Sequence, residues 1–142
     1  MHLLSISKNK KRIISMWIKY NPNPVSARVG DCAVRAVAKA LDIDWETSFA
    51  MIAKNGFIMG DIMSSNNVWG SVLREHGFYR NMLPNECPDC YSIKDFCKDY
   101  HEGVYVVGTS NHVVTVIDGN YYDTWDSGDE IPIYYWSKEK EA

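Results

Sequence analysis

Apolar residues in the first two thirds of the chain recur at the spacing of α-helices. From Ala33 to Leu41 they fall three and four positions apart, which places them on one face of a helix. Asp31 stands just before this stretch and is a favourable N-cap residue. The pattern therefore predicts a helix whose first position is Cys32.

Three further helices are predicted from the same spacing and from their cap residues. They are expected to begin after Asp44, Asn66 and Ser92. The first of them should end at Gly56, and Ser92 should form a capping box with Asp95. The side chains expected to face inward are Trp45, Phe49, Ile52 and Ala53 in the first, Trp69, Val72, Leu73 and His76 in the second, and Ile93, Phe96, Cys97 and Tyr100 in the third.

After Gly103 the pattern changes from helical to extended. Four strands are predicted, at residues 104–107, 112–117, 120–123 and 131–136, because these stretches are rich in β-branched and aromatic residues. Asp118-Gly119 is a strong signal for a two-residue hairpin turn between the second and third of them. Helices followed by an antiparallel sheet predict an α+β domain.

Length and charge narrow the class of protein. The 142 residues are enough for one domain with a real core. Met16 opens a segment that is typical of a natural start, so residues 1–15 are expected to be an N-terminal extension and residues 16–142 a single domain. The net charge of −3 argues against a nucleic-acid binder. Without a membrane-length apolar run or a secretory signal, the protein is expected to be cytoplasmic with reduced cysteines.

Cys32 carries the clearest chemical signature of the four cysteines. A thiolate is a far better nucleophile than a thiol, and the free amides and dipole at a helix start favour the anion. His112 opens a strand far downstream, where its ring can project toward the helix and act as the base. The base in turn needs an orienting acceptor, which the return strand supplies as Asp123 or Asp126.

The register of the hairpin decides between the two aspartates. A two-residue turn at Asp118-Gly119 puts Asp123 on the same face as His112 and Asp126 on the other face. A three-residue loop would shift the register by one and bring Asp126 opposite His112. Asp-Gly prefers the two-residue turn, so Asp123 is the expected partner and Asp126 the alternative.

Three short motifs follow one another in the order Cys, His, Asp. They are Gly30-Asp31-Cys32, Asn111-His112-Val113-Val114 and Asp123-Thr124-Trp125. This order resembles that of the papain-like cysteine peptidases, and the third motif is similar to their Asn-Ser-Trp, whose tryptophan covers the His–Asn pair. The compact spacing resembles bacteriocin leader-processing domains, and most of the chain is similar to small uncharacterised papain-like proteins of bacteriophages and prophages.

The resemblance implies a papain-like fold, with N-terminal helices and a nucleophile at a helix start packed on a C-terminal antiparallel sheet. It also implies a cysteine peptidase or amide hydrolase that acts on a protein or peptide substrate without a cofactor. Cys32, His112 and Asp123 would be its catalytic residues. Two alternatives remain open, namely a thiol-dependent acyltransferase of the transglutaminase kind and a non-catalytic papain-fold interaction module.

One feature of the family has no counterpart in this chain. Papain-like peptidases place a glutamine several residues before the cysteine, where it helps to bind the oxyanion. This sequence has no glutamine, and its nearby polar residues are Asn21, Asn23 and Ser26. The backbone N–H of Cys32 can supply one donor, but losing a second costs on the order of 3 kcal/mol of transition-state stabilisation. A weak peptidase, a transferase or a fold that has lost catalysis would each be consistent with this loss.

A second cluster of cysteines raises the question of a metal. Cys87 and Cys90 form a CxxC pair, and Cys97 and His101 follow it four residues apart. Three thiolates and an imidazole at these spacings can form a Cys₃His zinc site. Cys97 also fits the apolar face of its helix, and on that ground we expect packing rather than metal, with no stoichiometric zinc in the purified protein.

Overall fold

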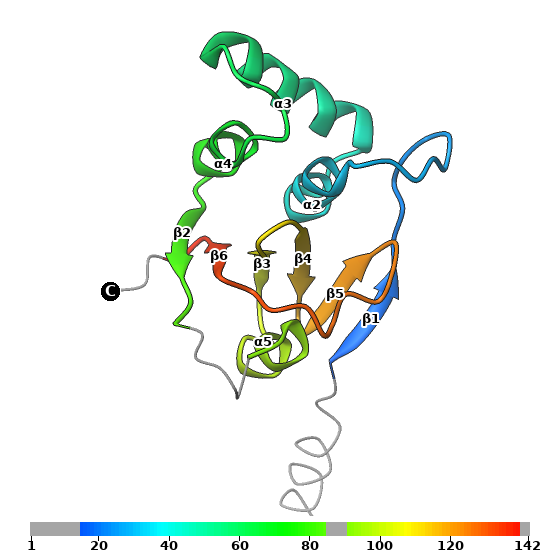
Figure 1. Cartoon of the computed structure of the whole chain (residues 1–142), viewed down its shortest axis with the longest axis vertical. Coiled ribbons are helices and arrows are strands. Elements are labelled where there is room, and N and C mark those ends of the chain that lie inside the picture. Colours follow the sequence, from blue (N-terminus) through cyan, green and yellow to red (C-terminus); the bar gives the residue numbers. More distant parts are fainter. Residues whose placement is uncertain (1–14, 85–90, 140–142) are drawn as a thin grey trace, which may run out of the picture.

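The computed structural model of the chain describes residues 15–84 and 91–139. These residues form four helices and a six-stranded sheet, so the protein is of the α+β class (Figure 1). The helices are α2 (Cys32–Leu41), α3 (Trp45–Met59), α4 (Asn66–Glu75) and α5 (Ile93–Asp99). The strands are β1 (Met16–Lys19), β2 (Tyr79–Met82), β3 (Val104–Gly108), β4 (Val113–Ile117), β5 (Asn120–Asp123) and β6 (Tyr134–Ser137). In this described part of the chain, no helix has the length and apolar character needed to cross a membrane.

The sheet is mixed, with the strand order β1-β5-β4-β3-β6-β2. β1 pairs with β5 in parallel, while the other neighbouring strands pair in antiparallel fashion. The prediction of a purely antiparallel sheet is therefore wrong at one edge. Both edge strands, β1 and β2, went unpredicted because they are four residues long and none of their residues is fully buried. Such strands carry little of the alternation by which a strand is recognised.

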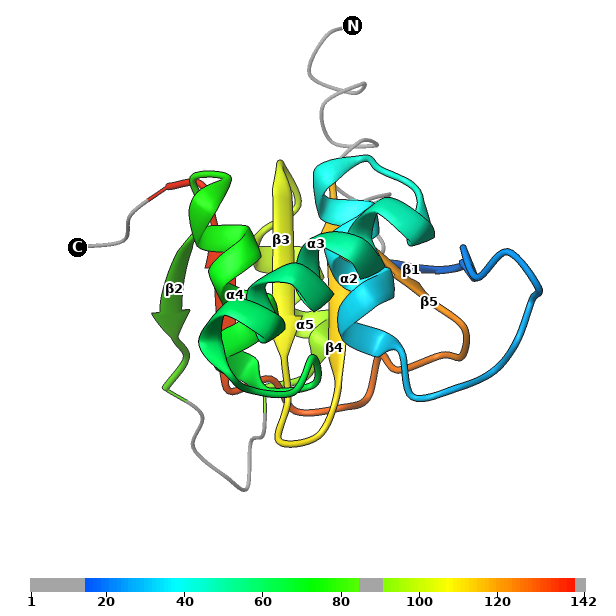
Figure 2. The same cartoon turned by 90° about the horizontal axis from the view of Figure 1, so that it is seen from above.

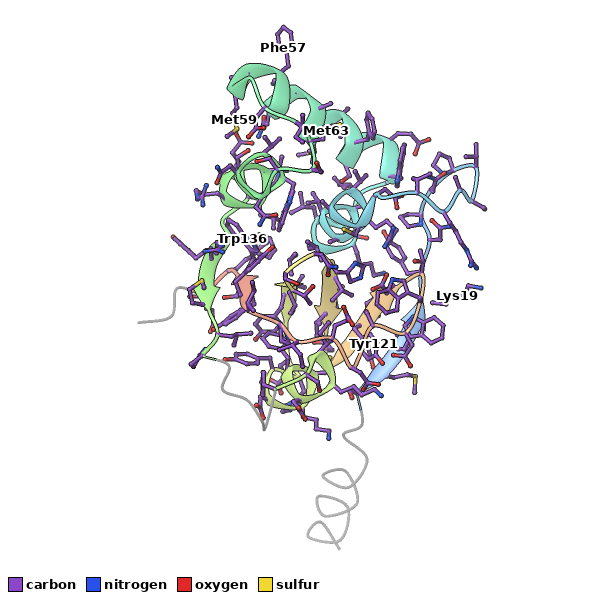
Figure 3. All side chains as sticks on the ribbon, in the orientation of Figure 1. Lys19, Phe57, Met59, Met63, Tyr121 and Trp136 are labelled. Carbon is purple, nitrogen blue, oxygen red and sulfur yellow. The ribbon has the colours of Figure 1, made fainter. Side chains whose placement is uncertain are left out.

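Helices cover both faces of the sheet. α2, α3 and α4 lie on one face and α5 lies on the other (Figures 1 and 2). Val37 and Leu73 pack with Trp136 in the first core, and Phe96 packs with Tyr121 in the second. Figure 3 shows Trp136 and Tyr121 on opposite sides of the sheet. The first core positions α2, and with it Cys32, against the central strands.

Three of the four predicted helix starts are confirmed, α4 begins at Asn66 itself instead of after it, and one predicted end is wrong. α2, α3 and α5 begin directly after the expected cap residues, and Ser92 and Asp95 form the capping box. α3 runs through Gly56 to Met59 and ends at Gly60, whose φ is 68°. A Cβ at Gly56 would lie 2.8 Å from the carbonyl oxygen of Asp61, so this glycine permits close packing instead of ending the helix.

Two side chains that were expected to face inward are exposed. Phe49 is 41% exposed and stacks on Trp45 with ring centroids 5.1 Å apart. His76 lies at the end of α4, where its Nδ1 is 2.8 Å from the carbonyl oxygen of Val72. The spacing of apolar residues places both side chains on the inward face of their helices, but no neighbouring helix or strand in the described part of the chain covers them.

The predicted hairpin turn is confirmed. Asp118 and Gly119 both have positive φ, at 50° and 80°, as a type I′ turn requires. Ile117 pairs with Asn120, so the loop between β4 and β5 contains two residues. This register places the end of β5 beside the beginning of β4. The last strand begins at Tyr134, after Pro132, instead of at residue 131.

Candidate active site

Cys32 is the first residue of α2 and is partly buried. Buried polar contacts fix this helix on two sides. The hydroxyl of Thr115 on β4 donates to the carbonyl oxygen of Ala36 at 2.6 Å, and the hydroxyl of Ser48 on α3 donates to that of Val34 at 2.8 Å. Neither hydroxyl is accessible to water. The first turn of α2 is therefore held at a defined place beside the sheet.

His112 directly precedes β4 at the end of a tight loop. The backbone N–H of Thr109 donates to the carbonyl oxygen of His112 at 2.8 Å and closes this loop. The side chains of His112 and Cys32 line the same cleft, and His112 and the backbone N–H of Val113 both lower the pKa of the thiol. The structure thus brings together the residues predicted as nucleophile and base.

Asp123, the last residue of β5, lies against the imidazole. Its Oδ2 is 2.6 Å from Nε2 of His112, and the residue is 1% exposed. Because an ionised carboxylate only accepts hydrogen bonds, Nε2 carries the hydrogen and Nδ1 is left for Cys32. Asp126 instead accepts from the Tyr121 hydroxyl and from a backbone N–H of its own turn. Of the two aspartates, the one that contacts His112 is the one that the hairpin register favours.

The surroundings favour an ion pair between the thiol and the imidazole. Burial raises the pKa of Cys32, but the hydrogen bond and charge of His112, the N–H of Val113 and the charge of Arg35 outweigh it and lower the pKa. Burial lowers the pKa of His112, but the hydrogen bonds and charges of Asp123 and Cys32 outweigh it and raise the pKa from 6.5 to about 9. Both directions favour the thiolate–imidazolium pair over the neutral thiol and imidazole.

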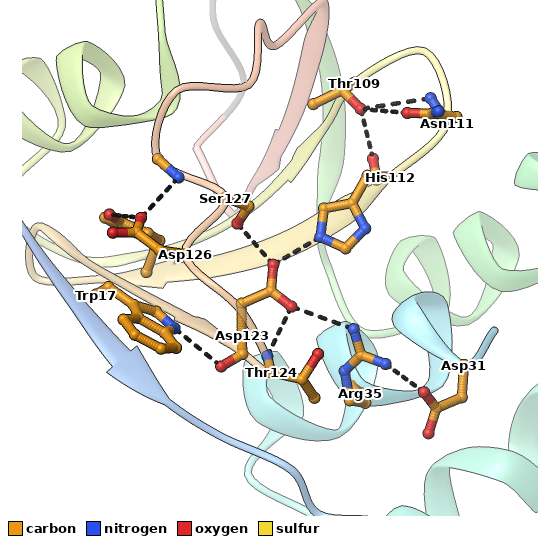
Figure 4. A network of polar contacts seen from close by, with 12 residues as sticks. Trp17, Asp31, Arg35, Thr109, Asn111, His112, Asp123, Thr124, Asp126 and Ser127 are labelled. Atoms are coloured by element: carbon orange, nitrogen blue, oxygen red, sulfur yellow. Dashed lines mark hydrogen bonds and ion pairs between the residues drawn. The ribbon is translucent and has the colours of Figure 1, made fainter. Parts of the chain in front are cut away.

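Four hydrogen bonds hold the carboxylate of Asp123 (Figure 4). Oδ2 accepts from the Ser127 hydroxyl at 2.6 Å as well as from His112. Oδ1 accepts from the backbone N–H of Thr124 at 2.8 Å and from Nη2 of Arg35 at 3.2 Å. Burial raises the pKa of Asp123, but the bonds from His112 and Ser127 outweigh it and lower the pKa. The carboxylate is therefore an ionised, fixed acceptor for the imidazole.

Arg35 belongs to this network and was missed in the sequence. It lies one turn after Cys32 on α2, is 6% exposed, and forms ion pairs with both Asp31 and Asp123. The available signal was the spacing of four between Asp31 and Arg35, together with a charged residue in an apolar run. Arg35 connects the nucleophile's helix to the aspartate that orients the base.

Asp31 occupies the N-cap position, but its side chain makes no cap hydrogen bond, contrary to the prediction. Its carboxylate pairs with Arg35 and accepts from Nε1 of Trp45 at 2.9 Å. The physical reason is that a buried guanidinium needs a charged partner more than a helix amide needs a cap. The backbone N–H groups in the first turn of α2, including that of Cys32, are therefore not hydrogen-bonded to the side chain of Asp31.

Two residues after β5 complete the surroundings of His112. The ring of Trp125 packs against the imidazole, with centroids 5.1 Å apart and planes inclined by 43°, as the resemblance implied. Ser127 is fully buried, and its hydroxyl donates to Asp123. Both side chains limit the access of water to the contact between His112 and Asp123, which strengthens that contact.

A cleft of about 720 Å³ opens beside Cys32 and His112. This volume lies in the range of small-molecule and peptide side-chain sites, roughly 300–1,000 Å³. Its lining is apolar where α3 and α4 contribute and polar at the loop before β4. The apolar residues are Trp45 and Phe49 on α3, Trp69 on α4 and Met63 between the two helices, and the polar ones are Thr109, Ser110 and Asn111 on the loop.

The candidate zinc cluster is described only in part. Cys87 and Cys90 lie outside the described residues. Cys97 is 1% exposed within the core beneath α5, and burial raises the pKa of its thiol to about 12. His101 is exposed. Within residues 15–84 and 91–139, no three ligand-type side chains come together as a metal site.

Cys32 is expected to react faster than Cys97 with iodoacetamide. The thiol of Cys32 has a lowered pKa and lines the cleft, whereas that of Cys97 is buried with a raised pKa. A brief, substoichiometric pulse at neutral pH followed by peptide mapping measures the difference, and it also tests the prediction that Cys32 is the most reactive of the four thiols. Preferential labelling of Cys97, Cys87 or Cys90 would contradict the assignment of the nucleophile.

Comparisons with known proteins assign no family to the chain. No protein-family model, curated protein or solved structure matches it. The chemistry of the site is accordingly inferred from its own geometry.

Proposed function

We propose that this protein is a cysteine peptidase or amide hydrolase of papain-like arrangement, with Cys32, His112 and Asp123 as its catalytic triad. One observation carries the proposal. The thiol at the start of α2 lines one cleft with His112, and Nε2 of His112 lies 2.6 Å from a buried, ionised Asp123. A nucleophile, a base and an acceptor that orients the base, all beside a cleft, are the parts that acyl transfer requires.

The reaction proceeds through an acyl-enzyme. The sulfur of Cys32 attacks the substrate carbonyl carbon and forms a C–S bond, while the π electron pair moves to the oxygen. When the pair returns, the bond to the amine breaks, and the amine leaves with the proton from Nδ1 of His112. Water then attacks the thioester, His112 takes a proton from it, and the C–S bond breaks to release the acid and the thiolate. Asp123 remains ionised and holds the ring throughout.

The lining of the cleft supports a protein or peptide substrate with a large apolar side chain near the scissile bond. Trp45 and Phe49 stack on each other along the cleft, and Phe49 is 41% exposed. Met63 and Trp69 line the same cavity. Covering exposed aromatic surface contributes roughly 25 cal/mol per Å², so an apolar substrate side chain would gain affinity there.

The proposal is tested with p-nitrophenyl acetate at neutral pH. We expect a burst of p-nitrophenolate together with one acetyl group on Cys32, located by peptide mapping. Cys32→Ser should abolish the burst, and His112→Ala should slow it by about 100-fold or more, which is the usual contribution of a general base. Acetylation that is scattered over lysines, or that survives at equal rate in His112→Ala, would contradict the proposal.

His112 is expected to titrate near pH 9 and to be protonated at neutral pH. Because its pKa is raised from 6.5, the imidazolium persists below about pH 9 and is lost as the pH rises through that value.

Amide hydrolysis, which needs this proton for the leaving amine, should decline over the same range. Nuclear magnetic resonance of the imidazole measures the titration. In Cys32→Ala the value should fall, because the thiolate no longer stabilises the cation. Titration of His112 near 6.5 in the wild type would count against the ion pair.

A further inference from the structure

The tetrahedral intermediate of the proposed reaction needs hydrogen-bond donors for its oxygen. Such donors are effective when they are fixed about 2.7–3.1 Å from the place where the negative charge develops. The backbone N–H of Cys32 lies in the first turn of α2, where no intrahelical acceptor exists, and can supply one donor. The chain has no glutamine, so a second donor has to be another type of residue.

Of the three candidate residues Asn21, Asn23 and Ser26, one lines the cleft. Asn23 is part of the lining, whereas Asn21 and Ser26 are not. Nδ2 of Asn21 donates to the carbonyl oxygen of Ala27 at 3.4 Å, which directs it into its own loop. Ser26 is exposed. The structure therefore selects Asn23 from the three residues that the sequence leaves open.

The orientation of the Asn23 amide follows from its contacts. Its Oδ1 accepts from the backbone N–H of Val25 at 3.0 Å, and only the oxygen end of the amide can accept. Nδ2, with its two hydrogens, is consequently the other end. The backbone holds the residue as well, because Asn23 N–H donates to Oδ1 of Asn21 at 3.2 Å and its carbonyl oxygen accepts from Ser26 at 2.9 Å.

Nδ2 of Asn23 is a donor without an acceptor. Asn23 is 7% exposed, and within the described part of the chain its Nδ2 donates to no protein atom. Among the same residues, Nε1 of Trp136 is the unpartnered side-chain nitrogen that solvent cannot reach, and Nδ2 of Asn23 is not in that class. Nδ2 of Asn23 is thus not sealed, and the surface to which Asn23 contributes is the cleft that also holds Cys32 and His112. A buried, fixed amide with a free donor is suited to an anionic ligand atom.

We propose that the side-chain amide of Asn23 is the second oxyanion donor of the site, in the role for which this chain has no glutamine. The inference rests on the proposed function. As the C–S bond to Cys32 forms, the carbonyl π pair moves to the oxygen, and Nδ2–H of Asn23 and N–H of Cys32 donate to it. When the pair returns and the bond to the leaving group breaks, both hydrogen bonds weaken. The amide transfers no proton.

The test compares two reagents that use the same thiolate. Attack on p-nitrophenyl acetate creates an oxyanion, whereas displacement of iodide from iodoacetamide does not. We expect the ratio of the acetylation rate to the alkylation rate to fall by about 100-fold in Asn23→Ala and in Asn23→Asp. The ratio cancels any change in the fraction of Cys32 that is ionised. Asn23→Asp keeps the acceptor for Val25, loses the donor and adds a negative charge, so an unchanged ratio in this variant excludes the donor role even if Asn23→Ala does not fold.

Asn67→Asp on the exposed surface of α4 is the matched control, and its ratio should equal that of the wild type. Wild-type acetylation at Cys32 with an unchanged ratio in Asn23→Asp would overturn the role of Asn23 and leave the proposed function standing. A wild type that alkylates at Cys32 but forms no acetyl-enzyme would overturn the proposed function, and this inference with it.

Discussion

Asp123→Ala is expected to slow the alkylation of Cys32 at neutral pH by about tenfold or more, which corresponds to a rise of about one unit in the pKa of the thiol. The carboxylate holds the imidazole through a 2.6 Å contact and raises its pKa. Without it, His112 loses its proton more readily and stabilises the thiolate less. The rate is measured with iodoacetamide on protein whose circular dichroism shows the native fold.

The same substitution should lower the free energy of unfolding by about 3–5 kcal/mol, because it leaves buried groups without their partner. The folded-state pKa of Asp123 is lowered from 3.8, so the contribution of the carboxylate is complete above that value and is lost as the pH falls through the lowered one. Denaturant unfolding at pH 7 and in acid measures both effects. Asp126→Ala is the matched control, since that carboxylate bonds Tyr121 and not His112. A larger loss of alkylation in Asp126→Ala would show that the orienting aspartate is misassigned.

Arg35→Met should destabilise the protein by a similar amount, about 3–5 kcal/mol near neutral pH. Methionine preserves the apolar stem of the side chain, but Asp31 and Asp123 then face each other's charge in a buried site without a cation. The loss should shrink in acid, where protonation of a carboxylate removes the uncompensated charge. Alkylation of Cys32 should also slow, because the charge of Arg35 helps to lower its pKa.

The control for this substitution is Arg28→Met, which removes the same charge from an exposed position of the loop before α2. Its free energy of unfolding should stay within about 0.5 kcal/mol of the wild type. Denaturant unfolding of both variants at two pH values makes the comparison. Equal stability of Arg35→Met and Arg28→Met at neutral pH would mean that the bridge between Asp31 and Asp123 contributes nothing.

The part of the site that could be predicted depends on local rules. The cap before Cys32 defined a helix start, and Asp118-Gly119 defined a turn whose register follows from two positive φ angles. From that register alone, Asp123 is placed on the face of His112, and the structure has the two in contact. Short-range backbone geometry is enough for these inferences, because neighbouring strands joined by a tight turn have little freedom.

The rest of the site depends on contacts between distant segments, which leave little trace in the sequence. Arg35 and Ser127 meet at Asp123 from α2 and from the loop after β5, and no spacing relates the two. Asp31 was expected to cap its helix by a local rule, but a buried guanidinium competed for its carboxylate. The parallel pairing of β1 with β5 is likewise a long-range contact of a short edge strand.

The ionisation of Cys32 is the most direct test of the central claim, that Cys32 and His112 form a reactive ion pair. Thiolate absorbance in the ultraviolet is followed against pH for the wild type and for Cys32→Ser, and the difference between the two curves reports Cys32 alone. The structure predicts that Cys32 ionises below the ordinary pKa of a cysteine and that its pKa rises in His112→Ala. A difference curve that rises at or above the ordinary value, and is the same in His112→Ala, would contradict the claim.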